Sequence, residues 1–528
     1  MFLYWLLAVP LIIVLGFVLD YLCLVKHSSD IPTVGNDAGF WAHVRSNFGY
    51  FTRQREWLKN GYNKYNKIGL PFLVPAGFSR SHDVVLPRSM LPWLRDQPET
   101  AVNARVAHNV AAYGDYNFLD PQIIQSSFGV RALQKSLNRS LPGLVSAVDE
   151  EVRHAVDVAL GQVGHDAWTS INLWDTWQSI VPSVTNRLLV GSPLCRDKRF
   201  LDSMVDFAHA VLRNCVLLRL LPQVLHPVLG RLLAVPNWIY WKRAYRVLEP
   251  VIRNRLDYMC RQAAGDADLR NWLPPEDYIT WLIRLALEEK CDAELDPVVI
   301  SKRLLPIEFA AIDTTVLTGV LWFQDLLKSP SVIQDLTSEL RAHEPNAGDS
   351  WSVKSLQSLV DMDSSIRESQ RVSNFHLTLV ERVVVAPDGL RLPGVGWKLP
   401  KGVHLTVNLD GSHHDDEFYN EPLAYDALRF SRMRKKRGDH NIGNDVATPI
   451  GMVTMSDHHF PFGHGKHTCP GRFFVAHEMK LIAAHLLLNF DIKPADVDAS
   501  RSWVGSGMIP PFSSRIQIRR KPPSPSHS

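Results

Sequence analysis

The stretch "DHHFPFGHGKHTCPGRFF", residues 457–474, places four histidines and one cysteine in a glycine-bearing loop. A structural zinc site draws its ligands in pairs from separate elements, and here all candidates lie in one loop, which argues against zinc. The histidines by themselves are typical of surface residues. Cys469 differs, because it precedes Pro470 at the predicted start of an apolar helix that runs to about Leu488. A helix N-terminus favours the thiolate, so the position indicates a metal ligand.

Four residues of this loop, Phe462, Gly465, Cys469 and Gly471, form the pattern F-x-x-G-x-x-x-C-x-G. The pattern resembles the haem-binding loop of the cytochrome P450 superfamily. The resemblance implies that Cys469 is the axial thiolate ligand of haem b (iron protoporphyrin IX), with Phe462 packed beside the cofactor. Most members have an arginine for a haem propionate two residues before the cysteine. This chain has His467 there, so we expect a weaker, pH-sensitive contact.

An upstream stretch, "AAIDTT" at residues 310–315, resembles the oxygen-activating segment of the same family. Asp296 and Pro297 are a suitable N-cap and first position for the helix that would carry it. Without the resemblance, a threonine in a helix usually bonds back to the preceding turn. With it, Thr314 is expected to hydrogen-bond dioxygen or its water, and Asp313 to relay protons. The family's usual glycine is Ala311 here.

Two further matches lie between these two segments, and a partial one lies nearer the N-terminus. "ESQR", Glu368 to Arg371, resembles the family's E-x-x-R helix, and Arg429 in "YDALRF" resembles the third member of its Glu-Arg-Arg cluster. A buried network of this kind would hold the segment before Cys469 in place. The W-x-x-x-R of an earlier helix is matched only in part, by Arg-Ala-Leu-Gln-Lys at 131–135. Lys135 is expected to replace the propionate-binding arginine, although a solvated helical lysine explains it too.

The rest of the chain predicts a mainly α protein with a small β-sheet region, as the P450 fold requires. Apolar residues recur at helical spacing over the ranges 143–162, 198–221, 240–263, 331–343 and 470–488. Strand-like runs occur near residue 83 and at 377–385, 403–409 and 514–520. With no internal repeat and no long internal linker, residues 49–520 are expected to form one catalytic domain. Residues 521–528 are predicted to be a disordered tail.

The N-terminus predicts a membrane anchor. Residues 2–19 carry no charge, and 18 residues in a helix span about 27 Å, close to the roughly 30 Å of a bilayer core. A cleaved signal peptide is the competing interpretation, but no basic segment precedes the apolar run and no cleavage site follows it. We therefore expect a transmembrane anchor at 2–24 and a linker at 25–48. The basic residues that follow the anchor are expected to keep the catalytic domain in the cytosol. Together with the anchor, the resemblance implies a single-pass protein of the endoplasmic reticulum membrane.

Residues 208–241 are unusually apolar but are broken by prolines and a glycine, so a second span is not expected. Two interpretations stay open. The segment forms either a buried helix pair or a surface that dips into the membrane and admits hydrophobic substrates.

No dinucleotide or flavin segment is found, so electrons must come from another protein. The resemblance implies that this electron donor is NADPH-cytochrome P450 reductase. Basic residues near Cys469 either form its docking patch or belong to a solvated charged loop: Lys466, Arg472, Lys480 and the run Arg432–Arg437. The net charge of +3 does not indicate a nucleic-acid partner. Apolar residues in the expected pocket regions suit a bulky hydrophobic substrate: Phe118, Phe128, Phe309, Phe375, Leu377, Met508 and Phe512.

The resemblance to fungal members makes a terpenoid or polyketide-derived secondary metabolite the leading expectation for the substrate. The expected reaction is hydroxylation or further oxidation of carbon, driven by dioxygen. Oxidative coupling or rearrangement without oxygen insertion is the alternative reaction. A non-catalytic, membrane-tethered haem-binding protein is the alternative of another class.

Overall fold

The computed structural model describes residues 2–25, 27, 30–35, 40–78, 80–346, 348–440, 450–496 and 501–522. The proposed linker 25–48 lies partly outside these ranges, and the tail 521–528 lies mostly outside them. The helices, in chain order, are α1 (Phe2–Cys23), α2 (Phe40–Lys64), α3 (Leu91–Asp96), α4 (Ala104–Ala112), α5 (Gly114–Asn117), α6 (Pro121–Gln125), α7 (Phe128–Leu160), α8 (Leu173–Leu189), α9 (Lys198–Arg219), α10 (His226–Leu233), α11 (Val235–Ala263), α12 (Tyr278–Glu289), α13 (Pro297–Leu326), α14 (Pro330–His343), α15 (Val353–Ser358), α16 (Val360–Val372), α17 (Leu409–His413), α18 (Arg429–His440) and α19 (Arg472–Asn489).

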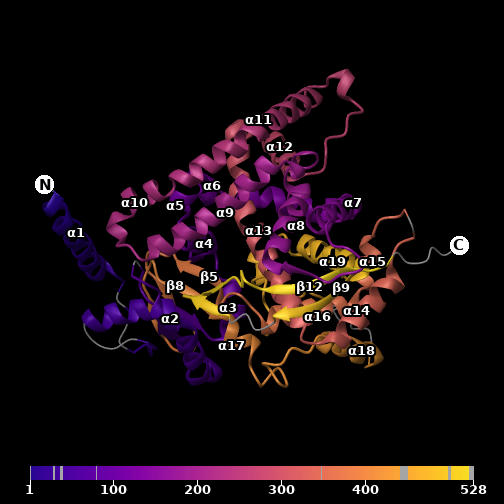
Figure 1. Ribbon diagram of the computed structural model, residues 1–528. Coiled ribbons are helices and arrows are strands. Elements are labelled where there is room, and N and C mark those ends of the chain that lie inside the picture. The colour runs from indigo at the N-terminus through magenta and orange to yellow at the C-terminus, as the bar shows by residue number, and fades with distance from the viewer. Residues whose placement is uncertain are drawn as a thin grey trace.

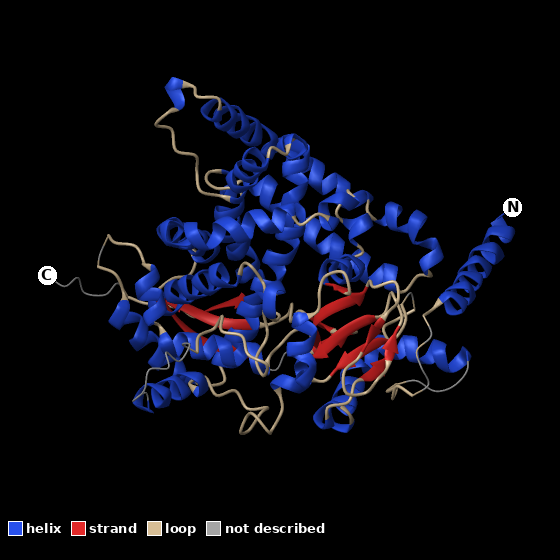
Figure 2. Ribbon diagram, turned by 180° about the vertical axis from the view of Figure 1, so that it is seen from behind, coloured by secondary structure: helices blue, strands red, loops and turns tan. Residues whose placement is uncertain are grey.

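The strands form small sheets that lie apart from one another beside the helices (Figure 2). The largest has the order β1 (Phe72–Val74), β2 (Asp83–Leu86), β8 (His404–Asn408), β5 (Thr378–Val384) and β3 (Val102–Asn103), and only β2 and β8 are parallel. A second sheet has the order β4 (Thr169–Asn172), β12 (Arg515–Arg520) and β9 (Phe490–Asp496). Two hairpins pair β6 (Leu390–Arg391) with β7 (Lys398–Leu399) and β10 (Ser502–Val504) with β11 (Gly507–Ile509). The prediction of a mainly α fold with a small β region is confirmed.

Helix α13 is the centre of the fold, with α8 and α9 packed on it (Figure 1). The predicted cap is confirmed, because the Asp296 carboxylate accepts a hydrogen bond from the Val298 N–H at 2.7 Å. α13 is long and apolar enough to cross a membrane, yet 56% of its apolar window is buried inside the protein. It is therefore a core helix, and it positions residues 310–315 in the middle of the molecule.

The predicted helices and strands are all present, but the N-terminal boundary of one helix, α7, lies well before the predicted one. The sequence predicts a helix from residue 143, just after Pro142, whereas α7 runs through that proline from Phe128. Leu133, Leu137 and Leu141 are buried at successive i, i+4 positions, so the apolar stripe continues across the proline. Packing of this stripe outweighs the loss of one helical hydrogen bond.

The N-terminal helix α1 stands out from the body, close to α10 and α2 (Figure 1). Its described apolar part, Leu11–Cys23, is shorter than a full span, and its side chains include several that are exposed. Asp20 is buried and accepts a hydrogen bond from the Gln223 N–H at 2.6 Å, in the turn before α10. This contact joins α1 to the apolar segment 208–241.

Segment 208–241 does not form a buried helix pair, so that interpretation is wrong. Its buried side chains face the core, but one side of α9, α10 and the start of α11 leaves large apolar residues exposed: Leu212, Val216, Leu217, Leu220, Val224, Val228, Leu232, Val235, Trp238 and Ile239. An apolar surface of this extent is typical of a membrane or protein contact.

Candidate active site

The loop before α19 is closed by its own backbone. The Cys469 N–H donates to the Phe462 carbonyl at 2.8 Å, and the Thr468 N–H and hydroxyl both donate to the Gly465 carbonyl, at 3.1 and 2.6 Å. Gly463 and Gly465 have φ of +80° and +69°, a region that side chains rarely adopt. The two glycines thus let the chain fold back so that Cys469 lies beside Phe462.

Cys469 is a partly exposed residue in a loop that packs against the core through Phe462. α19 begins at Arg472, three residues after the cysteine. Burial raises the pKa of the Cys469 thiol, while the N–H groups of Gly471 and Arg472 and the Arg472 charge act to lower it. Burial outweighs the helix terminus, so the expectation that this terminus alone favours the thiolate is wrong. A bound metal cation would favour the ionised sulfur.

A chain of polar contacts connects this loop to α16. The Phe460 N–H donates to His413 Nε2 at 3.2 Å, and the His413 carbonyl accepts from Arg371 Nη1 at 2.7 Å. Arg371 in turn makes two hydrogen bonds to Glu368, at 2.7 and 2.8 Å. Arg429 reaches the same carboxylate at 2.9 Å. The predicted Glu-Arg-Arg cluster is confirmed, and it is buried directly behind the loop.

The middle of α13 presents an accessible strip inside an otherwise buried helix. Ala310 is exposed and Thr314 is partly exposed, one turn apart on the same face. The Thr314 hydroxyl donates to the Ala310 carbonyl at 2.6 Å, the back-bonding typical of a helical threonine. Asp313, next in sequence, has only 14% of its side chain exposed. A space that admits water therefore lies against this part of α13.

A third feature is a group of basic side chains between β5, α4 and the loop. Arg382 is buried, and its Nη1 donates to the Glu381 backbone carbonyl. Among the described residues it has no carboxylate partner, so it makes no ion pair. Burial lowers its pKa to about 10. Burial and the Arg382 charge lower the pKa of His467 to about 4, and burial lowers that of His108. Glu99 lies 3.7 Å from His467. Arg382 therefore has the charge to hold a ligand that carries carboxylates, and the two neutral histidines can only donate hydrogen bonds to it.

Comparison with known proteins decides the family. The family model described as cytochrome P450 matches residues 127–511, which is most of the chain. This chain belongs to the cytochrome P450 family. It is 31% identical to the cytochrome P450 monooxygenase gloP of Glarea lozoyensis over 480 residues, 88% of this chain and 86% of gloP.

Two further relatives are similar over nearly their whole length. The cytochrome P450 monooxygenase polB of Polytolypa hystricis is 28% identical, covering 96% of this chain and 97% of polB. The cytochrome P450 monooxygenase astC of Aspergillus terreus is 26% identical, covering 94% of this chain and 93% of astC. The chain is thus a P450 monooxygenase, and its family holds haem b through an axial cysteine thiolate.

The site of this P450 fits haem b on three observations. Cys469 offers a thiol whose ionised form a bound iron would favour. The buried Arg382 guanidinium carries a positive charge that a haem propionate would balance, and the neutral His108 and His467 beside it offer ring N–H donors. The accessible strip of α13 leaves room against Thr314 for the small molecules that react at the iron.

Arg382 and His108 were not predicted from the sequence. Arg382 lies in "TLVERVV", where an arginine inside an apolar strand was the available signal. The direction in which the Arg382 side chain points depends on a β-bulge. The β5–β8 register shifts between Leu379 and Arg382, and Val380 inside the bulge has φ of +61°. A bulge re-aims the next side chain, and a β-branched residue at positive φ is strained. No sequence pattern shows that strain.

Arg382→Ala is expected to weaken haem retention by about 10- to 100-fold, since a hydrogen bond to a charged group contributes about 1.5–3 kcal/mol. The measurement is the ratio of haem absorbance to protein in purified enzyme, followed during dilution into a haem acceptor. Arg391→Ala, an exposed arginine on β6, is the matched control. Equal haem loss from both variants would show that Arg382 does not hold the cofactor.

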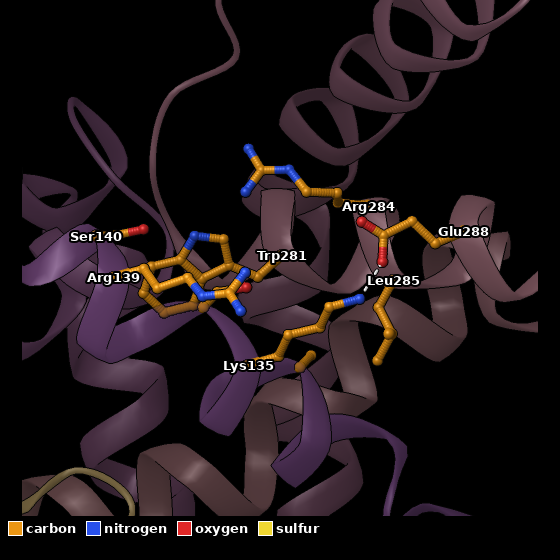
Figure 3. Close-up of a pocket in the computed structure, with 9 residues that line it drawn as sticks. Lys135, Arg139, Ser140, Trp281, Arg284, Leu285 and Glu288 are labelled. Atoms are coloured by element: carbon orange, nitrogen blue, oxygen red, sulfur yellow. Dashed lines mark hydrogen bonds and ion pairs between the residues drawn. The ribbon is translucent and has the colours of Figure 1, made fainter.

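Lys135 is not brought to the loop. It pairs with Glu288 on α12 and points away with Arg139, beside Trp281 (Figure 3). The neighbouring face of α7 carries Gln134 and Asn138 instead. These line a pocket of about 210 Å³ with Gly465, Lys466, Thr468, Pro470 and Arg472. One residue along a helix turns a side chain by about 100°, so a match off by one position selects the wrong face. The propionate role of Lys135 stays a prediction that this geometry does not support.

Proposed function

We propose that this P450 uses dioxygen and electrons from NADPH-cytochrome P450 reductase to hydroxylate or further oxidise a bulky hydrophobic small molecule. In this proposal Cys469 is the axial ligand, Phe462 packs beside the haem, and Gly465 shapes the loop. Arg382, His467 and His108 hold the propionates. The observation that supports it best is the closed loop that presents the Cys469 sulfur, together with the accessible strip of α13.

The bound haem would supply dioxygen activation and oxygen transfer to carbon. Thr314 and Asp313 would supply protons. The Thr314 hydroxyl holds its proton toward the Ala310 carbonyl at 2.6 Å, and rotation about χ1 turns the hydroxyl toward the open side of the strip. Asp313 is next to it in sequence and mostly buried, so few water molecules compete for a proton that its carboxyl group relays. A positioned acid of this kind typically contributes 10²- to 10⁴-fold to a rate.

Thr314→Ala is therefore expected to uncouple the reaction. NADPH is still consumed, but most of its electrons end in hydrogen peroxide, and product per NADPH falls about tenfold or more. The measurement is peroxide and NADPH in parallel assays. Thr318→Ala, one turn further along α13 and bonded back to the Thr314 carbonyl, is the control. If Thr314→Ala couples as well as wild type, Thr314 does not take part in proton delivery.

We place the reductase contact on the face formed by the loop and α7. Lys466 is half exposed and lines the 210 Å³ pocket with Arg472. Lys480, which the sequence suggested for this role, is unsuitable, because it is buried and pairs with Asp363 at 2.8 Å. In the predicted run 432–437, Arg432 pairs with Asp426, and the side chains from residue 436 lie outside the described residues.

We propose that the protein is held in the endoplasmic reticulum membrane by α1, with its catalytic domain in the cytosol. The exposed apolar side of α9, α10 and α11 supports this, because it joins α1 through the Asp20–Gln223 hydrogen bond. A surface that lies on the membrane beside an anchor can admit substrates that dissolve in lipid.

A hydrophobic substrate, as in fungal secondary metabolism, is supported by Phe309, which is partly exposed on α13, whereas the neighbouring Phe118 and Phe207 rings are fully buried. The Phe118 ring lies 5.9 Å from that of Phe309 on α13 and 6.3 Å from that of Phe207 on α9. Other predicted lining residues do not support it. Phe128 is buried under Arg131 and Arg303, and Phe512 packs on Trp174.

The test is to incubate microsomes that contain the protein and the reductase with extracts of a strain that lacks the protein, under isotope-labelled dioxygen. A product that gains labelled oxygen supports the proposal. A product that loses hydrogen without gaining oxygen would indicate coupling or rearrangement. If no extract causes NADPH to be consumed, the result would favour a haem-binding protein without turnover.

A further inference from the structure

An ion pair crosses from α9 to the acidic residue of α13. His209 Nε2 lies 3.6 Å from Asp313 Oδ1. Both oxygens of Asp313 are buried, and among the described residues neither accepts a hydrogen bond. A buried carboxylate without donors is costly unless a charge compensates it. His209 is the group placed to do this.

His209 also connects Asp313 to water. Its side chain is 46% exposed, whereas that of Asp313 is 14% exposed. It lies on the outward face of α9, while its neighbours Phe207 and Ala208 are buried. The imidazole therefore has one edge toward the buried carboxylate and another that exchanges protons with solvent.

The charge of His209 depends on the residues around it. Asp313 is the main cause that raises the pKa of His209, burial opposes it, and Asp206 on the same helix adds to the increase. Helices α4, α8, α10 and α11 also pack on α9, and none of their described residues contributes a charge that shifts this pKa. The imidazole is thus a cation at a higher pH than a free histidine, and it becomes neutral as pH rises through its raised pKa.

We propose that His209 is a positioning residue that holds Asp313 ionised and returns protons to it during turnover. This rests on the proposed oxygenase function, and it gives α9 a part in the proton supply. The His209 Nε2–H bond breaks as an Asp313 O–H bond forms, which leaves a neutral imidazole with its remaining proton on Nδ1. The ring then turns about χ2 so that the bare Nε2 meets solvent, takes a proton from a hydronium ion and returns to Asp313. A separation of 3.6 Å becomes a hydrogen bond with a small rotation of either side chain.

Two substitutions test the proton supply. His209→Gln removes the titrating charge, and His209→Lys keeps a cation across the working pH range. We expect the peroxide formed per NADPH in wild type to rise several-fold as pH increases through the His209 pKa. It should be high and independent of pH in His209→Gln, and low and independent of pH in His209→Lys. Asp206→Asn is the control, and it should only move the wild-type midpoint to lower pH.

Hydrogen–deuterium exchange in the full-length protein tests the ion pair without turnover. Peptides from α9 should exchange about threefold faster in His209→Gln than in wild type at pH 6, and wild type should approach the variant above the His209 pKa. Identical exchange in both at every pH would overturn the pair. If the exchange rates of His209→Gln change but its peroxide profile stays that of wild type, the proposed proton supply through His209 would be overturned. If the oxygenase function itself is wrong, neither wild type nor any variant, Thr314→Ala included, consumes NADPH. The exchange measurement then still shows whether the His209–Asp313 ion pair exists.

Discussion

Cys469→Ala is expected to abolish the thiolate-type spectrum of the reduced, carbon monoxide-bound protein and all monooxygenase activity. The loop presents one sulfur, and alanine offers the iron no ligand at that position. The measurement is the difference spectrum with haem content determined in parallel. Cys469→His is the informative second variant, because a nitrogen ligand can keep haem while the thiolate signature disappears.

The matched control for this prediction is Cys260→Ala. Cys260 is a partly buried cysteine on α11, outside the site, and its replacement should leave the spectrum unchanged. A wild-type spectrum from Cys469→Ala would show that another residue ligates the iron, and the assignment of the loop would then be wrong.

Glu368→Gln is expected to prevent accumulation of folded, haem-bound protein at 37 °C. Glu368 is the shared carboxylate of Arg371 and Arg429, and its loss leaves buried positive charge without a partner. Breaking a buried pair costs about 3–5 kcal/mol, a large part of the roughly 5–15 kcal/mol by which a typical domain is stable. Thermal unfolding of detergent-purified protein, followed with haem release, measures the effect.

The control for Glu368 is Glu249→Gln, which breaks a solvent-exposed pair with Arg253 on α11. An exposed pair contributes about 0–1 kcal/mol, so its unfolding temperature should stay near that of wild type. Glu368→Asp keeps the charge but shortens the reach to both arginines. Its unfolding temperature should fall between those of Glu368→Gln and Glu249→Gln. Wild-type stability in Glu368→Gln would mean that the cluster does not support the loop.

Local patterns were enough to predict the loop, the Glu-Arg-Arg cluster and the helix that carries Thr314. In each case the chemistry depends on residues a few positions apart, or on motifs in a fixed order. The haem-binding role of Cys469 and the proton role of Thr314 remain proposals, because spacing and geometry show position and not turnover.

The features that sequence could not provide depend on tertiary direction. A bulge at Val380 aims Arg382, the phase of α7 turns Lys135 away, and the packing of α9 on α13 brings His209 to Asp313. The sequence pattern of Lys480 is that of a surface lysine, but in the fold its side chain is buried and pairs with Asp363. Each outcome is set by a neighbour distant in sequence, which a single chain without its fold does not reveal.

The Asp20 carboxylate has a practical consequence for how the enzyme should be prepared. It lies near the end of the first helix and accepts the Gln223 amide hydrogen, so it fastens the turn that leads into α10. A truncated chain that starts after residue 24 gains solubility and leaves that amide to bulk water. If lipophilic substrates enter over the apolar side of α9 and α10, as proposed, this truncation would loosen their route, so substrate screening should use the intact polypeptide in a bilayer.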